Sequence, residues 1–470
     1  MEPLLILPGR RAVWVVLTLL GAFAAVVALP DTGLLAWVSF ALAAALVAGA
    51  LALVPDSAGY GAAALMATIA LKDGLPVVDA ASVGIFHVVA LALAAVMTVQ
   101  TWRSRGPGDR RPGVRLISYE WILAGPFLAG LWSLPTSLHT TKTVLYTGRL
   151  LLLWAIAVLV SRALASEHAR HRALLWFVAG STVAALVGLA QWAGLGIGNV
   201  AVQGNAFDGT LITRPAAFYL DPNFLGTHLV LGVVGGLALA FRRGTAWWWL
   251  VAVVPMLAAT AVTYSRSSWL ALAVGLLACV VFGPRELRAR LLAIVVAAGV
   301  IGAVIIGPAS LVARIGSVFD LTGGSSSATR LLMAEATVEM IADRPVFGTG
   351  LEAFQEAYSS YRKPGALVEV SHPHQVPLAL IAETGIPGLA VQVLLLAAVL
   401  NAHRRRARAG TTDVDVALIA GLFAMIVTAL LQYVLYFEPA WLFAGLLGSG
   451  VVLVKREAAE ASGRAGSGPL

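Results

Sequence analysis

Long apolar runs recur from one end of this 470-residue chain to the other, and they constrain its fold more than any other feature. Runs of about 18 or more apolar residues are long enough to cross the hydrocarbon core of a bilayer as helices. Hydrophobic residues make up 59% of the sequence and charged residues only 12%, which excludes an ordinary soluble protein. The sequence therefore predicts an all-α, polytopic integral membrane protein.

About 14 membrane spans are predicted from these runs. Their approximate bounds are 12–29, 34–54, 58–72, 81–99, 117–135, 143–161, 173–193, 224–241, 246–264, 268–283, 291–308, 376–400, 415–435 and 438–454. The run at 58–72 is short and rich in Gly and Ala. When it is counted as a span, however, every basic cluster between spans falls on one side of the membrane. By the positive-inside rule that side is cytoplasmic, and both termini lie there. We expect the first run to be a span and not a cleaved signal peptide, since no small-residue cleavage site follows it.

The spans leave two long loops on the extracytoplasmic side, at about 194–223 and 309–375. The chain is therefore expected to form one polytopic domain over residues 1–457. The tail at 458–470 is small and polar, and we expect it to be disordered.

The second long loop is predicted to contain an amphipathic helix over about Ser327–Ala342. Its proposed apolar stripe consists of Leu331, Ala334, Val338, Ile341 and Ala342. The helix should end at Asp343-Arg-Pro345, because the residue before a proline disfavours the helical region. We expect it to lie over the outer cavity as a lid, with this stripe facing the spans.

The net charge of +8 is mostly a topology signal and does not indicate a nucleic-acid partner. Ten basic residues nevertheless lie outside the cytoplasmic clusters, in outer loops or in the outer halves of spans. They are Lys72, Lys142, Arg149, Arg214, Arg266, Arg314, Arg330, Arg344, Arg362 and Lys363. Ionisable groups are costly to keep at a membrane, so this collection marks a functional-site hypothesis.

The most polar stretch runs from Arg330 to Gly388 and contains His372-Pro-His374-Gln375. Histidine is the side chain best suited to accept a proton near neutral pH. The structural alternatives are ordinary: a lone Gly-x-Gly is often a turn, and a histidine at a helix start is often a cap. A metal site is disfavoured, because no carboxylate lies at a diagnostic spacing from the two histidines. The single cysteine, Cys279, lies in an apolar run and excludes a disulfide framework.

Taken in order, this stretch resembles the signature region of the O-antigen ligase and O-antigen polymerase family, a lipid-linked oligosaccharide transferase superfamily that also includes protein O-oligosaccharyltransferases. The matching positions are Arg330, Pro345, Gly348, Gly350, Phe354, His374, Leu378, Glu383 and Gly385. The usual Asn after the histidine is Gln375 here, which keeps the amide and lengthens the side chain. Two further family features match, an Arg–aromatic–Pro-Asn series and a Ser-Arg pair in an outer hairpin. They fall at Arg214, Phe218, Pro222, Asn223, Ser265 and Arg266.

The resemblance implies a GT-C-like glycosyltransferase of the bacterial cytoplasmic membrane, with no cofactor and no metal. Its donor would be an undecaprenyl-pyrophosphate-linked glycan, and its acceptor a hydroxyl at the outer face. The acceptor stays open among lipid A-core, another glycan repeat and a protein. His374 would deprotonate or orient the acceptor, and arginines would bind the pyrophosphate. The binding candidates are Arg214 and Arg266, then Arg330 and Arg149, with support from Asn223, Gln375 and Glu383.

Two alternatives to a ligase remain. A polymerase is placed slightly behind a ligase. Polymerases of this family often carry two arginine-rich outer loops, whereas Arg214 is the only basic residue of the first long loop here. A solute transporter is disfavoured, since the chain shows no internal repeat and its charges gather at the outer face. Single residues also have simpler roles: Asp221 and Asn223 as a helix cap, Arg266 as an interfacial anchor, and Arg149 as a partner of Glu383 or of helix carbonyls.

Overall fold

The computed structural model describes the chain over residues 56–71, 76–78, 83–103, 116–164, 166–197, 202–205, 211–240, 248–283, 326–367 and 370–465, together with 299–300 and 307. The predicted spans at 12–29 and 34–54, and nearly all of 291–308, fall outside these residues.

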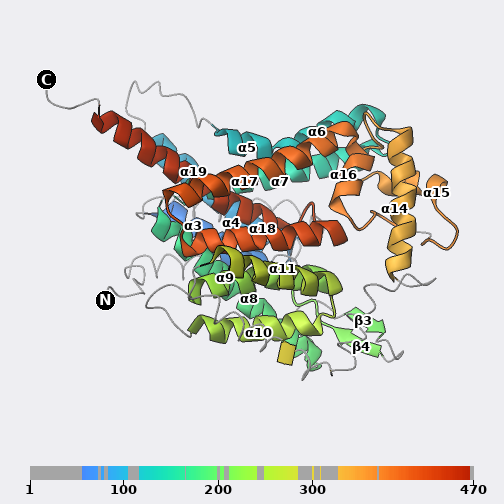
Figure 1. Ribbon diagram of the computed structural model, residues 1–470, viewed down its shortest axis with the longest axis horizontal. Helices are drawn as coiled ribbons and strands as arrows, with labels where there is room; N and C mark the ends of the chain where they lie inside the picture. The colour runs from blue at the N-terminus through green and yellow to red at the C-terminus, as the bar shows by residue number, and fades with distance from the viewer. Residues whose placement is uncertain are drawn as a thin grey trace.

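Long helices pack side by side in a bundle (Figure 1). They are α4 (Ile85–Arg103), α7 (Thr140–Ala163), α8 (Glu167–Trp192), α9 (Pro222–Ala240), α10 (Trp248–Val262), α11 (Arg266–Phe282), α17 (Ile386–Ala409), α18 (Asp413–Leu431) and α19 (Glu438–Ala465). Among the described residues, α7, α8, α9, α17, α18 and α19 are the six helices long and apolar enough to cross a membrane. These helices confirm an all-α membrane bundle, and the predicted number of 14 spans stays a prediction.

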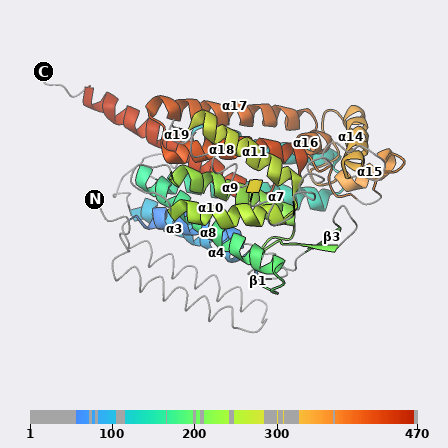
Figure 2. The ribbon, with the colours of Figure 1, turned by 60° about the horizontal axis from the view of Figure 1, so that its bottom comes forward.

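Helix α9 lies at the centre of the bundle and α17 at its edge (Figure 2). Within the apolar window of each helix, 89% of the residues of α9 are buried, against 22% for α17. A helix that is apolar all round and buried belongs to a core, whereas an exposed apolar face on a spanning helix suits contact with lipid. The bundle therefore has an interior of its own besides its lipid-facing surface.

One end of the bundle is covered by short elements, and we call it the capped end (Figure 1). These elements are α14 (Ser326–Asp343), α15 (Phe354–Tyr361), α16 (Val376–Thr384) and the antiparallel hairpin β3 (Val202–Asn205) with β4 (Leu211–Arg214). The hairpin belongs to the first predicted long loop and was not expected in an all-α chain. A second small pair, β1 (Pro76–Val78) with β2 (Val83–Gly84), follows the short helices α3 (Ser57–Thr68) and η1 (Ile69–Leu71).

Two predicted spans are broken in the structure. The run at 117–135 forms α5 (Ser118–Leu123), α6 (Gly125–Ser133) and η3 (Leu134–Thr136), and the run at 376–400 is divided into α16 and α17 at Gly385. Helices α6 and α17 each have a proline in their first turn. The missing N–H of proline is tolerated at that position, but proline disfavours continuation of the helix before it. Gly385 has a φ of 70°, which ends α16 at the capped end.

Helix α14 confirms the predicted amphipathic helix, with bounds that extend one residue beyond each predicted end. It lies across the capped end, against α15 and α16 (Figure 1). The predicted apolar face is wrong: Leu331 is 49% exposed and Val338 is 56% exposed. The buried face instead carries Met333, Ala336, Thr337 and Met340, because α15 packs there through Phe354, Ala357 and Tyr358.

The last long helix, α19, packs along α7. It remains helical to Ala465 and thus enters the segment 458–470, for which the sequence predicts a disordered tail. Residues 466–470 lie outside the described part.

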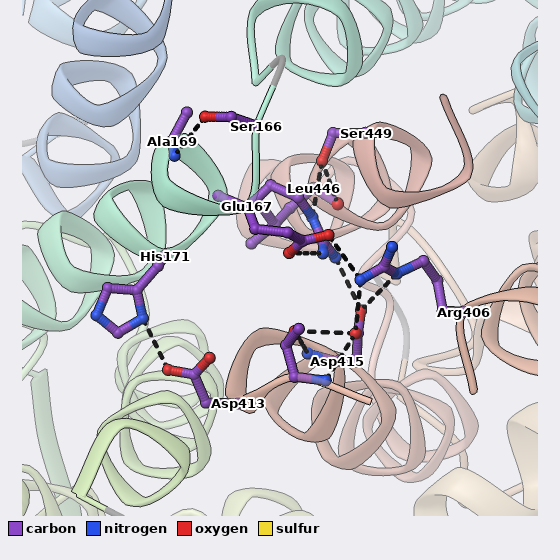
Figure 3. Close-up of polar contacts among 11 residues, drawn as sticks. Ser166, Glu167, Ala169, His171, Arg406, Asp413, Asp415, Leu446 and Ser449 are labelled. Atoms are coloured by element: carbon purple, nitrogen blue, oxygen red, sulfur yellow. Dashed lines mark hydrogen bonds and ion pairs between the residues drawn. The ribbon is translucent and has the colours of Figure 1, made fainter. Parts of the chain in front are cut away.

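The other end of the bundle holds a buried set of ion pairs, which we call the opposite-end network (Figure 3). Arg170 is fully buried and donates to Asp415, 2.9 Å away, and to Glu167, 2.6 Å away. Arg406 donates to the same two carboxylates, and Ser449 accepts from Arg170. Two cations therefore balance two anions where α8, α17, α18 and α19 meet. Removing one partner of such a buried pair typically destabilises by about 3–5 kcal/mol, so the network holds these helices together.

Candidate functional site

Arg214 joins three elements at the capped end. It ends β4, its Nε donates to the carbonyl oxygen of Thr263 at 2.8 Å, and its Nη2 donates to Oδ1 of Asn223 at 3.2 Å. Thr263 follows the last turn of α10, where unpaired carbonyls favour a cation, and Asn223 lies in the first turn of α9. The structure thus brings together the predicted pair Arg214 and Asn223, with the asparagine amide orienting the guanidinium.

The cap role considered for Asp221 is confirmed by the start of α9. Oδ1 of Asp221 accepts the backbone N–H of Asn223 at 2.6 Å, and Pro222 occupies the first helical position. The Asp221 carboxylate also opposes the effect of burial on Arg214, because it raises the pKa that burial lowers.

Three of the predicted arginines gather, and we call Arg214, Arg266 and Arg330 the arginine cluster. Arg266 is the first residue of α11, directly after the N-cap Ser265, and Arg330 lies in the second turn of α14. Burial lowers the pKa of both the Arg214 and the Arg330 guanidinium, and the neighbouring Arg266 cation lowers each further. Like charges held together in this way favour an anionic ligand.

His374 adjoins this cluster. Burial is the main cause that lowers the pKa of its imidazole, and the Arg330 cation lowers it further, so the ring is neutral and able to accept a proton at neutral pH. Its φ of 54° lies in the left-handed region, which costs a non-glycine residue roughly 1–3 kcal/mol and is found mainly at functional sites. The ring of His372 meets it edge-on, with centroids 4.9 Å apart.

Gln375 occupies the N-cap position of α16. Its carbonyl oxygen accepts the N–H of Ala379 at 3.1 Å, while its side chain forms no capping hydrogen bond. The amide that replaces the family's asparagine is therefore not used to start the helix. Its supporting role stays a prediction.

The Pro-x-x-Gly-x-Gly segment clamps the break between α16 and α17. Thr349 and Gly350 donate backbone N–H groups to the carbonyls of Ala382 and Glu383 at 3.0 and 2.9 Å. Gly348, with a φ of 71°, lies so close that a Cβ there would be 2.4 Å from the carbonyl carbon of Glu383. Gly350 has a φ of 100°, and a Cβ there would be 2.5 Å from Oγ of Ser137. Both glycines of the motif therefore have a backbone reason, Gly348 against the end of α16 and Gly350 against Ser137.

Glu383 is buried at the end of α16, outside the six spanning helices. Its relative exposure is 0%, and neither carboxyl oxygen has a hydrogen bond of good geometry to a described residue. Burial raises the pKa of this carboxyl well above its usual range, and the nearby Glu352 carboxylate raises it further, so both causes favour the protonated form of Glu383.

Arg149 is not the partner of Glu383, which corrects one of the simpler expectations. Its Nη2 lies 3.0 Å from Oε1 of the buried Glu438, and its guanidinium lies 5.3 Å from the ring centroid of Tyr436. The Arg149 charge is thus already balanced within the bundle. This residue belongs to the acidic and aromatic side of the capped end and not to the arginine cluster.

Sequence reasoning missed Tyr433 and Glu352. The Tyr433 ring stacks on that of His372, with centroids 4.6 Å apart and planes 21° apart, and its hydroxyl donates to Oε1 of Glu352 at 2.8 Å. The available signal was the aromatic group at 433–437 that separates two apolar runs just before Glu438. The apolar run at 415–435 extends through Tyr433, so its local pattern predicts a span there and not a segment of the site.

In the part of the chain that the structure describes, no three His, Cys, Asp or Glu side chains are grouped to hold a metal ion. The groups that the described residues supply at the capped end are cations, a neutral histidine and hydroxyl or carboxyl groups. These can bind an oxyanion, stabilise charge that grows on a leaving group, and accept a proton.

Residues 250–393 match the family model described as O-antigen ligase. The matched region extends from α10 into α17 and contains Arg266, Arg330, His374 and Glu383, whereas Arg149 and Arg214 precede it. This match confirms the resemblance inferred from the motif stretch. Comparison with curated proteins gives no match.

Proposed function

Because the chain carries an O-antigen ligase family domain over residues 250–393, we propose that it transfers a glycan from an undecaprenyl-pyrophosphate carrier to an acceptor hydroxyl. The reaction takes place at the extracytoplasmic face of a bacterial cytoplasmic membrane. The observation that carries the proposal is the gathering of Arg214, Arg266 and Arg330 beside His374 at one end of a membrane bundle.

The arginine cluster binds the pyrophosphate. A guanidinium remains charged at any relevant pH and presents paired donors that fit a phosphate. As the bond between the sugar C1 and the pyrophosphate oxygen breaks, the electron pair leaves with the carrier pyrophosphate. The cluster stabilises that growing negative charge, which is the largest electrostatic demand of the reaction.

His374 receives the acceptor proton. The acceptor oxygen forms the new bond to C1, and its proton passes to the neutral imidazole. Burial, with a smaller contribution from the Arg330 cation, keeps the His374 pKa low, so the accepting form is available at neutral pH. No nucleotide sugar is needed, because the carrier pyrophosphate is itself the leaving group.

The remaining candidates have smaller roles. Asn223 orients Arg214 through its Oδ1, and Gln375, at the N-cap of α16 and next to His374, supports the histidine turn. Arg149 is a lesser pyrophosphate contact, because Glu438 already balances its charge. Glu383 supports the motif segment from within α16.

The acceptor distinguishes a ligase from a polymerase, since both break the same bond. A ligase transfers to lipid A-core or to a protein hydroxyl, whereas a polymerase transfers to another glycan repeat. A solute transporter is less consistent with the positions of the arginine cluster and the opposite-end network, which lie at the two ends of the bundle and not at its middle.

The test is transfer of a labelled glycan from its polyprenyl carrier by the full chain in proteoliposomes, with the three acceptors offered separately. We expect labelled product and free carrier pyrophosphate from one acceptor class. Arg362→Ala, an exposed residue of the same end, should retain this activity and serves as the control. Movement of an intact solute across the vesicle without cleavage of the carrier bond would contradict the proposal and favour a transporter.

A further inference from the structure

The segment 432–437, between α18 and α19, reaches the histidine turn from a distant part of the sequence. Tyr433 is only 7% exposed, and it stacks on His372 while its hydroxyl bonds to Glu352. One buried side chain therefore contacts the turn that carries His374 and the segment that carries the glycine motif. Tyr433 lies outside the matched domain.

The same segment is fixed on both sides of Tyr433. Gln432 donates from Nε2 to the hydroxyl of Ser267, the residue after Arg266. Phe437 stacks on Phe224, the residue after Asn223, with centroids 5.9 Å apart. The backbone that presents Tyr433 is thus tied to the start of α11, which presents Arg266, and to the start of α9, where Asn223 accepts a hydrogen bond from Arg214.

Two residues near Tyr433 have unfavourable backbones. His374 has a φ of 54° and Glu352 a φ of 61°, although neither is a glycine. Such conformations persist only where surrounding contacts hold them. Tyr433 bonds directly to Glu352 and packs on His372, two residues before His374, so it contacts both strained turns.

We propose that Tyr433 is a positioning residue for the transfer step, with its ring holding the His372–His374 turn and its hydroxyl fixed by Glu352. The inference rests on the proposed function, because it assigns a second residue to the same site. Tyr433 acts through His372 and Glu352 and is not itself the base. Its loss should therefore reduce turnover and leave donor binding to the arginine cluster largely intact.

The sequence indicates no role for His372, and the stack provides one. His372 supplies the ring surface through which Tyr433 holds the turn. His372→Ala removes that surface, whereas His372→Phe restores an aromatic ring that cannot accept a proton. Recovery of turnover by the phenylalanine variant would separate positioning by the ring from proton chemistry.

The experiment compares Tyr433→Phe, which keeps the ring and loses the hydroxyl bond, with Tyr433→Leu, which loses both. Misplacement of a reacting group by about 1 Å can reduce rate about 100-fold, so we expect a loss of that order in kcat for the leucine variant. Donor affinity should change by less than about threefold. The phenylalanine variant should fall between leucine and wild type.

The matched control is Tyr361→Phe. Tyr361 also donates its hydroxyl to a carboxylate, Oδ2 of Asp343 at 2.8 Å, but this bond lies on the exposed side of the capped end. Its removal should leave transfer unchanged. A general effect of losing any tyrosine–carboxylate bond would instead appear in both variants.

A second readout is the titration of His372, followed by NMR on histidine-labelled protein. Burial, with a smaller contribution from the His374 charge, lowers the pKa of His372 to about 4. Tyr433→Leu exposes that ring, so its pKa should rise toward the ordinary value, whereas Tyr433→Phe should preserve it. A leucine variant with wild-type kcat, or with an unchanged His372 titration, would overturn the inference alone. Absence of transfer by the wild-type protein would instead overturn the proposed function, and this inference with it.

Discussion

Nε of Arg214 donates to the carbonyl oxygen of Thr263 at 2.8 Å, so one cation of the arginine cluster also closes the end of α10. Its second contact, to Asn223, uses a different nitrogen of the same planar group. A planar fork can make both contacts and still face a ligand, whereas an ammonium group is a single point of charge.

Lysine should therefore not substitute for arginine in the variant Arg214→Lys. We expect weaker donor binding, by roughly 1–3 kcal/mol for the loss of hydrogen bonds to a charged group, and a larger effect for Arg214→Ala. The measurement is binding of labelled lipid-linked donor to each variant. Equal affinity of the lysine variant and wild type would contradict a role for the planar group.

His374→Ala should remove turnover without removing the donor. A general base typically contributes about 100- to 10,000-fold in rate, and the arginine cluster is unaffected by the change. Single-turnover transfer and donor binding are measured on the same preparation. A variant with near-normal transfer would mean that His374 is not the base.

Arg330→Gln should shift the pH dependence of transfer. The neutral ring of His374 is the base, so activity is lost as pH falls through its pKa, and the Arg330 cation lowers that pKa. Removing the cation raises the pKa, and the acidic limb of kcat/KM should move to higher pH. Arg344→Gln, an exposed arginine directly after the end of α14, is the control and should leave the limb in place.

Glu383→Gln should change how stability depends on pH. The folded-state pKa of Glu383 is raised, so the folded protein keeps a proton that the unfolded chain releases above its ordinary value of 4.5. The free energy of unfolding therefore falls as pH rises above that value, until the folded pKa is reached. The glutamine variant stays neutral, so this part of the fall should disappear from thermal unfolding curves in detergent.

Glu356→Gln should change the pH dependence of the free energy of unfolding in the opposite direction, although Glu356 lies at the same end of the bundle. Burial alone would raise the Glu356 pKa, but Lys142, 2.8 Å away, and a backbone N–H lower it overall. Its stabilising contribution is present above the unfolded pKa and is lost as pH falls. The free energies of unfolding of the two glutamine variants should thus diverge as pH rises. Parallel curves of stability against pH would contradict both the raised pKa of Glu383 and the lowered pKa of Glu356.

Gly348→Ala should destabilise by about 2 kcal/mol or more. A Cβ there meets the backbone of Glu383, and the positive φ is unfavourable for alanine. Gly148→Ala is the matched control, because that glycine lies inside α7 and no atom of a described residue lies within 4 Å of its added Cβ. The control should be neutral or gain up to about 1 kcal/mol from helix propensity.

Labelling of introduced cysteines tests the orientation of the bundle. Ser360→Cys, at the capped end, should react with an impermeant reagent in intact cells, whereas Arg404→Cys should react only after permeabilisation. Both positions are exposed, and the native Cys279 is buried, so background reaction is low. Reactions in the reverse order would place the arginine cluster on the wrong side for the proposed donor.

The features that follow from local chemistry could be predicted from the sequence. Apolar runs indicate spanning helices, and the proline at 345 ends α14 where expected. The buried face of α14 could not be predicted, because Met333 and Met340 are selected by contact with α15 and not by the best local stripe. The division at Gly385 was missed for a similar reason, since an apolar run continues on both sides of it.

The residues of the candidate site likewise divide into those that a local motif predicts and those that only tertiary packing brings to the site. Arg266, Arg330 and His374 belong to a motif that can be recognised as a series of residues, and the structure brings them together. Tyr433 has no motif, and its importance appears only when a segment 59 residues after His374 folds back onto His372. Contacts between distant segments depend on tertiary packing, which local periodicity does not encode.

The opposite-end network also bears on how the chain is made. Arg170 lies 245 residues before Asp415, so its carboxylate partner enters the membrane long after α8 does. Until α18 arrives, a nascent chain therefore holds Arg170 beside a single carboxylate, that of Glu167, which is 41% exposed even in the finished bundle. Chains truncated before Asp413 would lack the second, buried carboxylate, so the unfinished bundle should be less stable than the complete one.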